Sequence, residues 1–207
     1  MNTSSAVMQQ RAEPADSLDF FPTPPWGTRV LCEQLINIKP TDTIWEPACG
    51  EGAMAKTLME YSNGVTASDI FDYGYGHIGD FLSPTHPGIT ADWIITNPPF
   101  KLAKEFIQKS LGISDKGVAM ILRIAFLEGI TRYNELFSST PPTKVGVFSE
   151  RIPMVKGRLD KTAGSATCYA WFVWEYSKQG TELVWIPPCR KLLERDEDYE
   201  AYPTEVR

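Results

Sequence analysis

Short apolar runs alternate along this chain with stretches whose apolar residues recur at helical spacing. The apolar and β-branched runs predict strands at 42–47, 64–69, 92–95, 117–126, 144–150, 167–176 and 182–186. The helical spacing predicts helices at 27–38, 53–61 and 127–137, and one that starts near 101. Because strands and helices alternate through most of the chain, the pattern indicates an α/β fold built on a largely parallel sheet.

The composition is that of one globular domain. The chain has 207 residues, of which 43% are hydrophobic, and no apolar run approaches the roughly 18 residues that a membrane span needs. The first residues are polar and lack the apolar stretch of a signal peptide. We therefore expect a cytoplasmic protein, with residues 1–19 as a flexible arm that carries none of the chemistry and 189–207 as an acidic, partly helical or disordered tail.

Cysteine and histidine usage gives no reason to expect a metal. Cys32, Cys49, Cys168 and Cys189 lie far apart and lack the spacing of metal ligands, so free thiols in a reducing compartment are expected. The two histidines, His77 and His86, fall in a stretch that is typical of a loop, and we interpret them as surface residues.

The most informative motif follows the predicted strand 92–95 and reads Thr-Asn-Pro-Pro-Phe from Thr96 to Phe100. In a parallel sheet the loops at the carboxyl ends of strands line the ligand crevice. The prolines fix the backbone, so the Asn97 amide and the carbonyls of Asn97 and Pro98 can face outward as hydrogen-bond acceptors for an amino group. Phe100 could stack on the ring that carries this amino group. The alternative is a plain strand-ending turn, since Asn and Pro are common in turns.

A second motif lies about fifty residues upstream, where Trp45-Glu46-Pro47-Ala48-Cys49-Gly50-Glu51-Gly52 leads from the first strand into a helix. Glycines there let the backbone pass close to a ligand at the start of a helix. The third glycine of a dinucleotide fingerprint is replaced by Ala55, and no nucleotide phosphate loop is present, which disfavours a dehydrogenase or a nucleotide hydrolase. Glu46 suits a cationic ligand better than a pyrophosphate.

Asp69 ends the second predicted strand seventeen residues after Gly52. This spacing is near the roughly 20 residues at which an acidic side chain reaches ribose hydroxyls in Rossmann-like folds. The alternative for Asp69 is a cap on the turn that follows the strand.

Together these motifs resemble the S-adenosylmethionine-dependent amino-methyltransferases, and their order, with an Asn-Pro-Pro-Phe loop, most resembles small phage-type DNA adenine methyltransferases. The resemblance covers residues 21 to about 186. It implies a Rossmann-like class I fold in residues 20–188, with a mostly parallel seven-stranded sheet, an antiparallel C-terminal hairpin and helices on both faces. Its implied cofactor residues are Phe21, Pro22, Thr23, Glu46, Pro47, Ala48, Gly50, Gly52, Asp69, Ile70, Asp80, Phe81 and Asn97, and its implied catalytic residues are Asn97, Pro98, Pro99 and Phe100.

The distribution of charged residues along the chain indicates a candidate binding partner. The net charge is −6, but residues 101–161 hold 11 Lys or Arg and 6 Asp or Glu, while the rest of the chain holds 9 and 20. Within this segment we interpret Lys101, Arg151, Lys156, Arg158 and Lys161 as phosphate contacts of a nucleic acid, the alternative being a solvated loop. The family's usual target-recognition domain has no counterpart, so the loop 151–161 or a partner would have to supply sequence specificity.

The sequence therefore predicts an enzyme that methylates the 6-amino group of adenine in DNA after base flipping. Methylation of RNA bases or of a protein glutamine amide is left open, because both acceptors are planar amines. A protein that binds S-adenosylmethionine without turnover is a further alternative. The recognition sequence, the oligomeric state and the biological role do not follow from the sequence.

Overall fold

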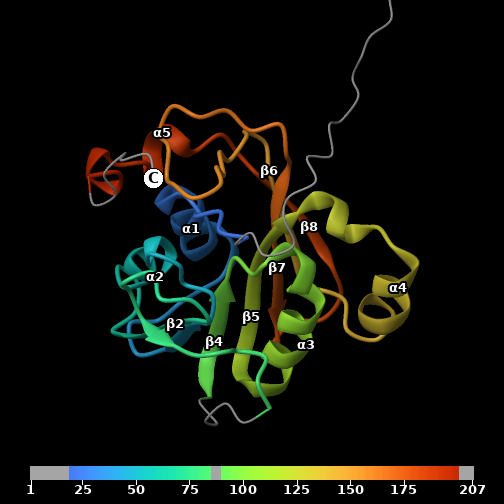
Figure 1. Ribbon diagram of the computed structural model, residues 1–207. Coiled ribbons are helices and arrows are strands. Elements are labelled where there is room, and N and C mark those ends of the chain that lie inside the picture. Colours follow the sequence, from blue (N-terminus) through green and yellow to red (C-terminus); the bar gives the residue numbers. More distant parts are fainter. Residues whose placement is uncertain (1–18, 85–89, 201–207) are drawn as a thin grey trace, which may run out of the picture.

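A computed structural model describes residues 19–84 and 90–200, which are organised around one eight-stranded sheet (Figure 1). The strands lie in the order β3-β2-β1-β4-β5-β7-β6-β8. Their bounds are Thr43–Glu46 (β1), Gly64–Asp69 (β2), His77–Ile78 (β3), Ala91–Thr96 (β4), Ser114–Arg123 (β5), Lys144–Phe148 (β6), Tyr169–Glu175 (β7) and Glu182–Ile186 (β8). All neighbouring pairs are parallel except those that β7 makes with β5 and β6. The predicted α/β fold, mostly parallel with antiparallel pairing near the C-terminus, is confirmed.

Helices cover both faces of the sheet. One face carries α1 (Pro25–Val30), which continues as the π-helical turn η1 (Leu31–Leu35), and α2 (Ala53–Leu58); the other carries α3 (Ala103–Ile113) and η4 (Tyr133–Phe137). The remaining elements are the 3-10 turns η2 (Phe100–Leu102), η3 (Ile124–Leu127) and η5 (Asp196–Asp198), and the short helices α4 (Ile130–Arg132) and α5 (Arg190–Leu193). Within the described residues, no helix combines the length and the hydrophobicity that crossing a membrane requires.

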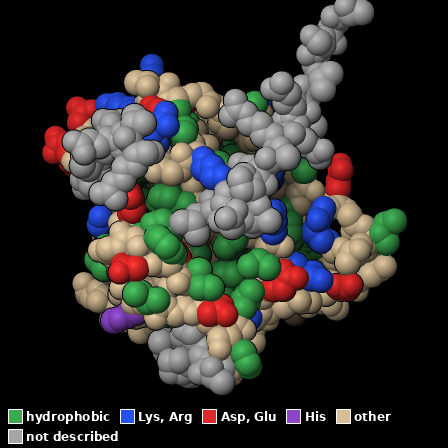
Figure 2. Space-filling view, viewed as in Figure 1, with side chains coloured by type: hydrophobic (Ala, Val, Ile, Leu, Met, Phe, Trp, Pro, Cys, Tyr) green, Lys and Arg blue, Asp and Glu red, His purple; other side chains and the backbone are tan. Residues whose placement is uncertain are grey.

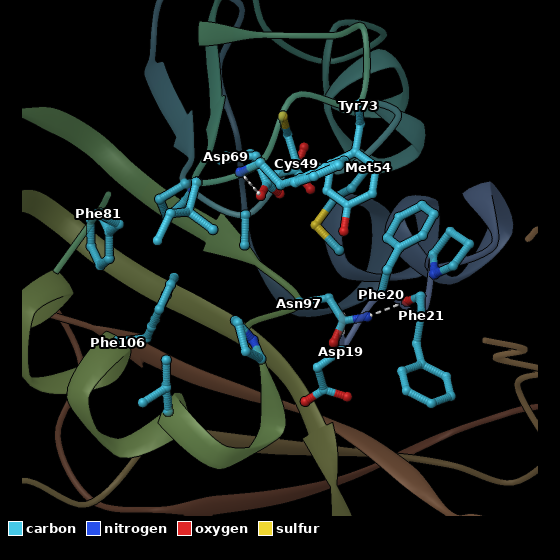
Figure 3. A pocket seen from close by; sticks show the side chains of 18 of the residues that line it. Asp19, Phe20, Phe21, Cys49, Met54, Asp69, Tyr73, Phe81, Asn97 and Phe106 are labelled. Atoms are coloured by element: carbon cyan, nitrogen blue, oxygen red, sulfur yellow. Dashed lines mark hydrogen bonds between the residues drawn. The ribbon is translucent and has the colours of Figure 1, made fainter. Parts of the chain in front are cut away.

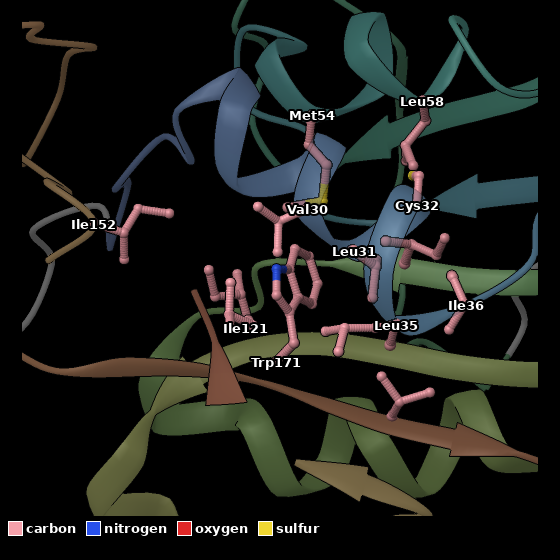
Figure 4. Close-up of a cluster of buried hydrophobic side chains, with 14 of the residues drawn as sticks. Val30, Leu31, Cys32, Leu35, Ile36, Met54, Leu58, Ile121, Ile152 and Trp171 are labelled. Carbon is pink, nitrogen blue, oxygen red and sulfur yellow. The ribbon is translucent and has the colours of Figure 1, made fainter. Parts of the chain in front are cut away.

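The paired strands β5 and β7 contribute side chains to the hydrophobic core on both faces of the sheet. Along β7, Trp171 and Val173 point toward the α1 and α2 face, whereas Phe172 and Trp174 point toward α3, as expected for a strand buried on both sides. Trp171 is fully buried and donates a hydrogen bond from its indole N–H to the carbonyl of Gly27, 2.9 Å away (Figure 4). This bond fixes α1 against the centre of the sheet.

Several boundaries differ from the sequence prediction, including that of β5, which spans Ser114–Arg123 and not 117–126. All seven predicted strands form, but β3 adds an eighth in the stretch expected to be a loop, because two residues are too few for periodicity to reveal. The helix predicted at 127–137 is wrong in its first turn: Gly129 has φ +135° and Glu128 is extended, so helical structure begins only at Ile130. The helix predicted at 27–38 already begins at Pro25, passes into a π-helical turn after Val30 and ends at Leu35.

The described part of the predicted C-terminal tail packs against α1. Arg29 is 2% exposed and donates hydrogen bonds to both carboxylate oxygens of Asp198, at 2.7 and 2.8 Å, and to Glu60. Burial alone would lower the pKa of Arg29, but these hydrogen bonds outweigh it and hold the pKa above its ordinary value. Residues 189–200 are thus held by a buried ion pair.

We predict that Arg29→Met lowers the free energy of unfolding by about 3 to 5 kcal/mol at pH 7, because it leaves the Asp198 carboxylate buried without a cationic partner. Urea unfolding at pH 7 measures this. The matched control is Arg195→Met, since Arg195 is half exposed and bonds the same Glu60 at 3.1 Å; it should cost under about 1 kcal/mol. Equal losses in the two variants would contradict the buried ion pair.

Candidate active site

An open cavity of about 900 Å³ lies at the carboxyl ends of β1, β2 and β4 (Figure 3). The cavity brings together most of the residues that the sequence singled out: Phe21, Pro22, Thr23, Glu46, Pro47, Ala48, Asp69, Ile70, Asp80, Phe81, Asn97 and Pro99. Gly50, Gly52, Pro98 and Phe100 do not line it.

Glu46 places a buried carboxylate in the cavity wall. The residue is 2% exposed, and its Oε2 has no hydrogen-bond partner among the described residues. Desolvation raises the pKa of Glu46 well above its ordinary value; the Ala55 N–H opposes the shift by hydrogen bonding, and the nearby Asp69 adds to it. A buried carboxyl with an unused oxygen is a group that a cationic ligand would stabilise in its ionised form.

Two glycines give the loop after β1 its conformation. Gly50 and Gly52 have φ values of +51° and +83°, and a Cβ atom on either would lie within 2.4 Å of the ring of Phe20 or Tyr75. Both positions therefore require glycine. The Gly50 N–H donates to Asp69 Oδ2 at 2.9 Å, which ties the loop to the end of β2.

Asp69 keeps acceptor capacity toward the cavity. Its Oδ2 accepts the Gly50 N–H, and its Oδ1 accepts the Phe71 N–H at 3.0 Å, so each oxygen retains a second lone pair. Ile70 follows it and is 66% exposed. The remaining lone pairs of the Asp69 carboxylate suit the hydroxyl groups of a ligand. The turn-capping role that the sequence offered as an alternative is also present, because Phe71 belongs to the turn after β2.

Asp80 and Phe81 lie on another wall of the cavity. Asp80 is exposed and accepts a hydrogen bond from the Leu82 N–H at 2.9 Å. Phe81 is buried; its ring packs 5.2 Å from that of Trp45 and 4.8 Å from that of Phe106. The aromatic wall is therefore rigid, and a flat ligand ring could pack against it.

Asn97 connects the loop after β4 to the N-terminal segment (Figure 3). Its Nδ2 donates to the Phe21 carbonyl at 2.7 Å and to Thr23 Oγ1 at 3.2 Å. Because a carbonyl only accepts hydrogen bonds, the amide must turn its NH₂ toward Phe21. The carbonyl oxygen Oδ1 then has no partner among the described residues and is left to accept a donor in the cavity.

Phe100 does not line the cavity, but its ring packs against a residue that does. Its ring lies 5.6 Å from that of Phe21 and 5.9 Å from that of Tyr169, and the Arg123 guanidinium sits 4.4 Å from its centroid. The Phe100 N–H donates to Asp19 Oδ2 at 2.7 Å. Phe100 thus contributes to the cavity indirectly. Its ring packs against Phe21 and its N–H binds Asp19, and both of these residues line the cavity.

The structure adds residues that the sequence analysis did not identify: Asp19, Phe20, Cys49, Met54, Phe71, Tyr73, Leu102 and Phe106 line the same cavity. Asp19 is the last residue of the predicted arm, whose residues 1–18 lie outside the described residues. Phe20 and Tyr73 pack with ring centroids 4.7 Å apart. Phe20 adjoins the Phe21-Pro22-Thr23 motif, which is a usable sequence signal, whereas Tyr73 is brought in only by the loop after β2.

The loop 151–161, which carries most of the predicted basic residues, lies beside the cavity. Ile152 and Met154 are buried, and the Gly157 N–H donates to the Phe20 carbonyl at 2.8 Å, which fixes the loop to the N-terminal segment. The predicted nucleic-acid residues Lys101, Arg151, Lys156, Arg158 and Lys161 are all exposed. Arg158 pairs with Asp160 at 3.0 Å and Lys161 with Asp196 at 2.5 Å. Figure 2 shows Lys and Arg side chains beside the apolar surface on this side of the molecule.

Within residues 19–84 and 90–200, no group of three or more His, Cys, Asp or Glu side chains could hold a metal ion. The four cysteines are free thiols, and only Cys168 is exposed. His77 lies exposed in β3, and His86 is outside the described residues. The cavity lining contains four acidic side chains, the Asn97 amide and several aromatic rings.

No protein-family model matches this chain, and neither does any curated protein. Among solved structures, one from Pyrococcus horikoshii, provisionally assigned as an RNA methyltransferase, is similar with a TM-score of 0.58 and 18% identity over 79% of this chain and 90% of that one. A modification subunit of a provisionally assigned type I restriction enzyme from Vibrio vulnificus YJ016 has a TM-score of 0.56 and 15% identity over 90% of this chain and 50% of that one. These similarities establish the Rossmann-like fold of class I methyltransferases.

We predict that Glu46→Gln stabilises the protein increasingly as the pH rises. Below the unfolded-state pKa of about 4.3, the Glu46 carboxyl is neutral in both the folded and the unfolded state, so the wild type and the variant should have similar stability. Between that value and the raised folded-state pKa, the wild type loses stability relative to the variant by at most about 1.4 kcal/mol per pH unit, because ionisation is disfavoured only in the folded state. Urea unfolding from pH 4 to 8 measures the difference. Glu51→Gln, in the same loop but partly exposed, is the control; the same pH trend in both would refute the assignment to Glu46.

Proposed function

We propose that this protein is an S-adenosylmethionine-dependent methyltransferase that methylates the 6-amino group of adenine in DNA after base flipping. The observation that carries the proposal is the geometry of Asn97. Its NH₂ is held by Phe21 and Thr23, which leaves Oδ1 as an acceptor in a cavity that also contains the buried Glu46 carboxyl, whose Oε2 has no partner among the described residues. The Asn97 oxygen suits a neutral amine, and the Glu46 carboxyl suits a cation.

The cavity residues fit the cofactor. S-adenosylmethionine carries an ammonium, a sulfonium, ribose hydroxyls and an adenine ring. Glu46 would bind its cationic end and Asp69 its hydroxyls; Asp80 would accept from the ring amine, and Phe81 would pack against the ring. Phe21, Pro22 and Thr23 would cover the methionine part, with Ile70 at the ribose. When bound, the cofactor supplies a methyl group on a positively charged sulfur, which is a good leaving group.

Asn97 would activate the acceptor. The lone pair of an aromatic amine is delocalised into its ring, so the amine is a weak nucleophile. If Asn97 Oδ1 and the Pro98 carbonyl accept both N–H groups, the nitrogen is drawn toward tetrahedral geometry and its lone pair becomes available. Positioning the nitrogen in line with the methyl group then supplies most of the catalysis, and no nucleophilic side chain is needed.

A nucleic acid acceptor is favoured by the surroundings of the cavity. An amine of a duplex base must leave the stack before it can reach Asn97. Phe100 would then stack against the extruded base while Arg123 holds the ring from its other face. The exposed cations Lys101, Arg151 and Lys156 lie where a phosphate backbone could follow the loops beside the cavity.

RNA is the second candidate acceptor. The two solved structures described above are named for RNA methylation and for the modification subunit of a restriction enzyme, so both kinds of nucleic acid occur among proteins of this fold. A glutamine amide of a protein would fit Asn97 as well, but a protein acceptor supplies no phosphate groups for the exposed Lys and Arg side chains. Transfer of labelled methyl to unmethylated DNA, total RNA and protein extract, followed by digestion to nucleosides, distinguishes these outcomes; methylated cytosine would reassign the base.

We predict that Asn97→Ala abolishes methyl transfer while S-adenosylmethionine binds within a few-fold of the wild-type affinity. The Asn97 side chain acts on the amine, whereas Glu46 and Asp69 provide the charged contacts to the cofactor. Calorimetry measures binding, and label transfer measures turnover. As the converse control, Asp69→Ala should weaken cofactor binding by about 1 to 3 kcal/mol, the loss expected for a charged hydrogen-bond partner. Retained turnover in Asn97→Ala would disprove the mechanism.

We predict that Lys101→Ala reduces the salt dependence of DNA affinity by about one unit of slope, because each phosphate contact releases one counterion. Lys101 is exposed and has no ion-pair partner among the described residues. Lys161→Ala is the matched control, and its effect on the slope should be smaller because Lys161 already pairs with Asp196. Affinity measured from about 50 to 300 mM salt tests both. A slope unchanged by Lys101→Ala would remove this residue from the DNA contact.

A further inference from the structure

Asp19 places a carboxylate against the loop that holds the acceptor. The residue is half-buried and lines the cavity together with Asn97 and Pro99 (Figure 3). Its Oδ2 accepts the Phe100 N–H at 2.7 Å, three residues beyond Asn97. Its Oδ1 has no hydrogen-bond partner among the described residues. Tyr169 and Arg123, around the Phe100 ring, are the nearby titratable and charged groups.

The proposed reaction requires a proton acceptor at this place. When the amine nitrogen attacks the methyl carbon, an N–C bond forms, the C–S bond breaks and its electron pair stays on sulfur as a neutral thioether. The nitrogen is left positively charged with one hydrogen too many. The Asn97 amide and the Pro98 carbonyl can accept hydrogen bonds from this group, but neither is basic enough to remove a proton at neutral pH.

The other carboxyl groups of the cavity bond other parts of the backbone. Four acidic residues line it: Asp19, Glu46, Asp69 and Asp80. Asp69 and Asp80 accept backbone N–H groups of the loops that follow β1, β2 and β3. Glu46 is bound to the Ala55 N–H of α2. Among these four acidic residues, only Asp19 bonds the loop of Asn97.

We propose that Asp19 is a catalytic residue whose Oδ1 accepts the proton of the methylated amine and then passes it to water. The proposal rests on the proposed methyl transfer. Before the proton moves, the negative charge of Asp19 also stabilises the positive charge that develops on the nitrogen. The carboxylate thus comes from a segment far from the acceptor loop in sequence.

Two substitutions separate this role from a structural one. Asp19→Asn keeps an amide oxygen that can accept the Phe100 N–H but removes the charge and the basic group. We expect it to lower kcat about 100-fold or more, the usual contribution of a general base, with KM for DNA and cofactor within about threefold. Asp19→Ala removes both functions, so its kcat should also fall, and added formate should restore part of it.

Asp72→Asn is the matched control, because Asp72 is an exposed aspartate that likewise accepts one backbone N–H, from Gly74 at 2.8 Å, without lining the cavity. It should keep the wild-type kcat. A wild-type kcat in Asp19→Asn, or a loss confined to cofactor affinity measured by calorimetry, would overturn the proposal and leave methyl transfer standing. A wild-type protein that methylates no acceptor would overturn both the proposed function and the role of Asp19.

Discussion

The hydrogen bond from the Asn97 amide to the Phe21 carbonyl joins segments that are distant in the sequence. Through it the loop after β4 is fixed to the extended segment 20–23, and the loop after β6 is fixed to the same segment by the bond from Gly157 to Phe20. The loop after β4 and the segment 20–23 both line the cavity, together with the loops after β1 and β2 at the sheet edge. Because the bond uses the donor side of the amide, it also determines that an acceptor faces the cavity.

Charge is separated between the inside of the site and its surroundings. The cavity is lined by four acidic residues, among them the buried Glu46, whereas the cations of the loop after β6 are exposed. Such a division suits a site that holds a small cationic cofactor and takes its acceptor from a polyanion. The ion pairs of Arg158 and Lys161 with neighbouring acids reduce the free positive charge on this loop, so phosphate contacts there would compete with existing pairs.

Aromatic side chains make the site rigid. Phe20 and Tyr73 pack on each other, Phe81 packs between Trp45 and Phe106, and Arg123 covers the Phe100 ring. The glycines at positions 50 and 52 leave room for the rings of Phe20 and Tyr75, which a larger side chain would overlap. In this chain the glycine-rich loop therefore shapes the cavity through its neighbours, and Glu46, Pro47 and Ala48 form the lining itself.

The sequence by itself determined seven of the eight strands, their order along the chain and the two loops that bear the chemistry, because buried strands leave apolar runs and strand-ending motifs are local. It also identified twelve of the cavity residues, since Glu46, Asp69 and Asn97 directly end strands or follow them. It could not determine that Asp19 lies in the cavity wall and bonds Phe100, or that Asp198 pairs with Arg29. The first pair is separated by 81 positions in the sequence and the second by 169, and only the folding of the whole chain around the sheet brings such residues together.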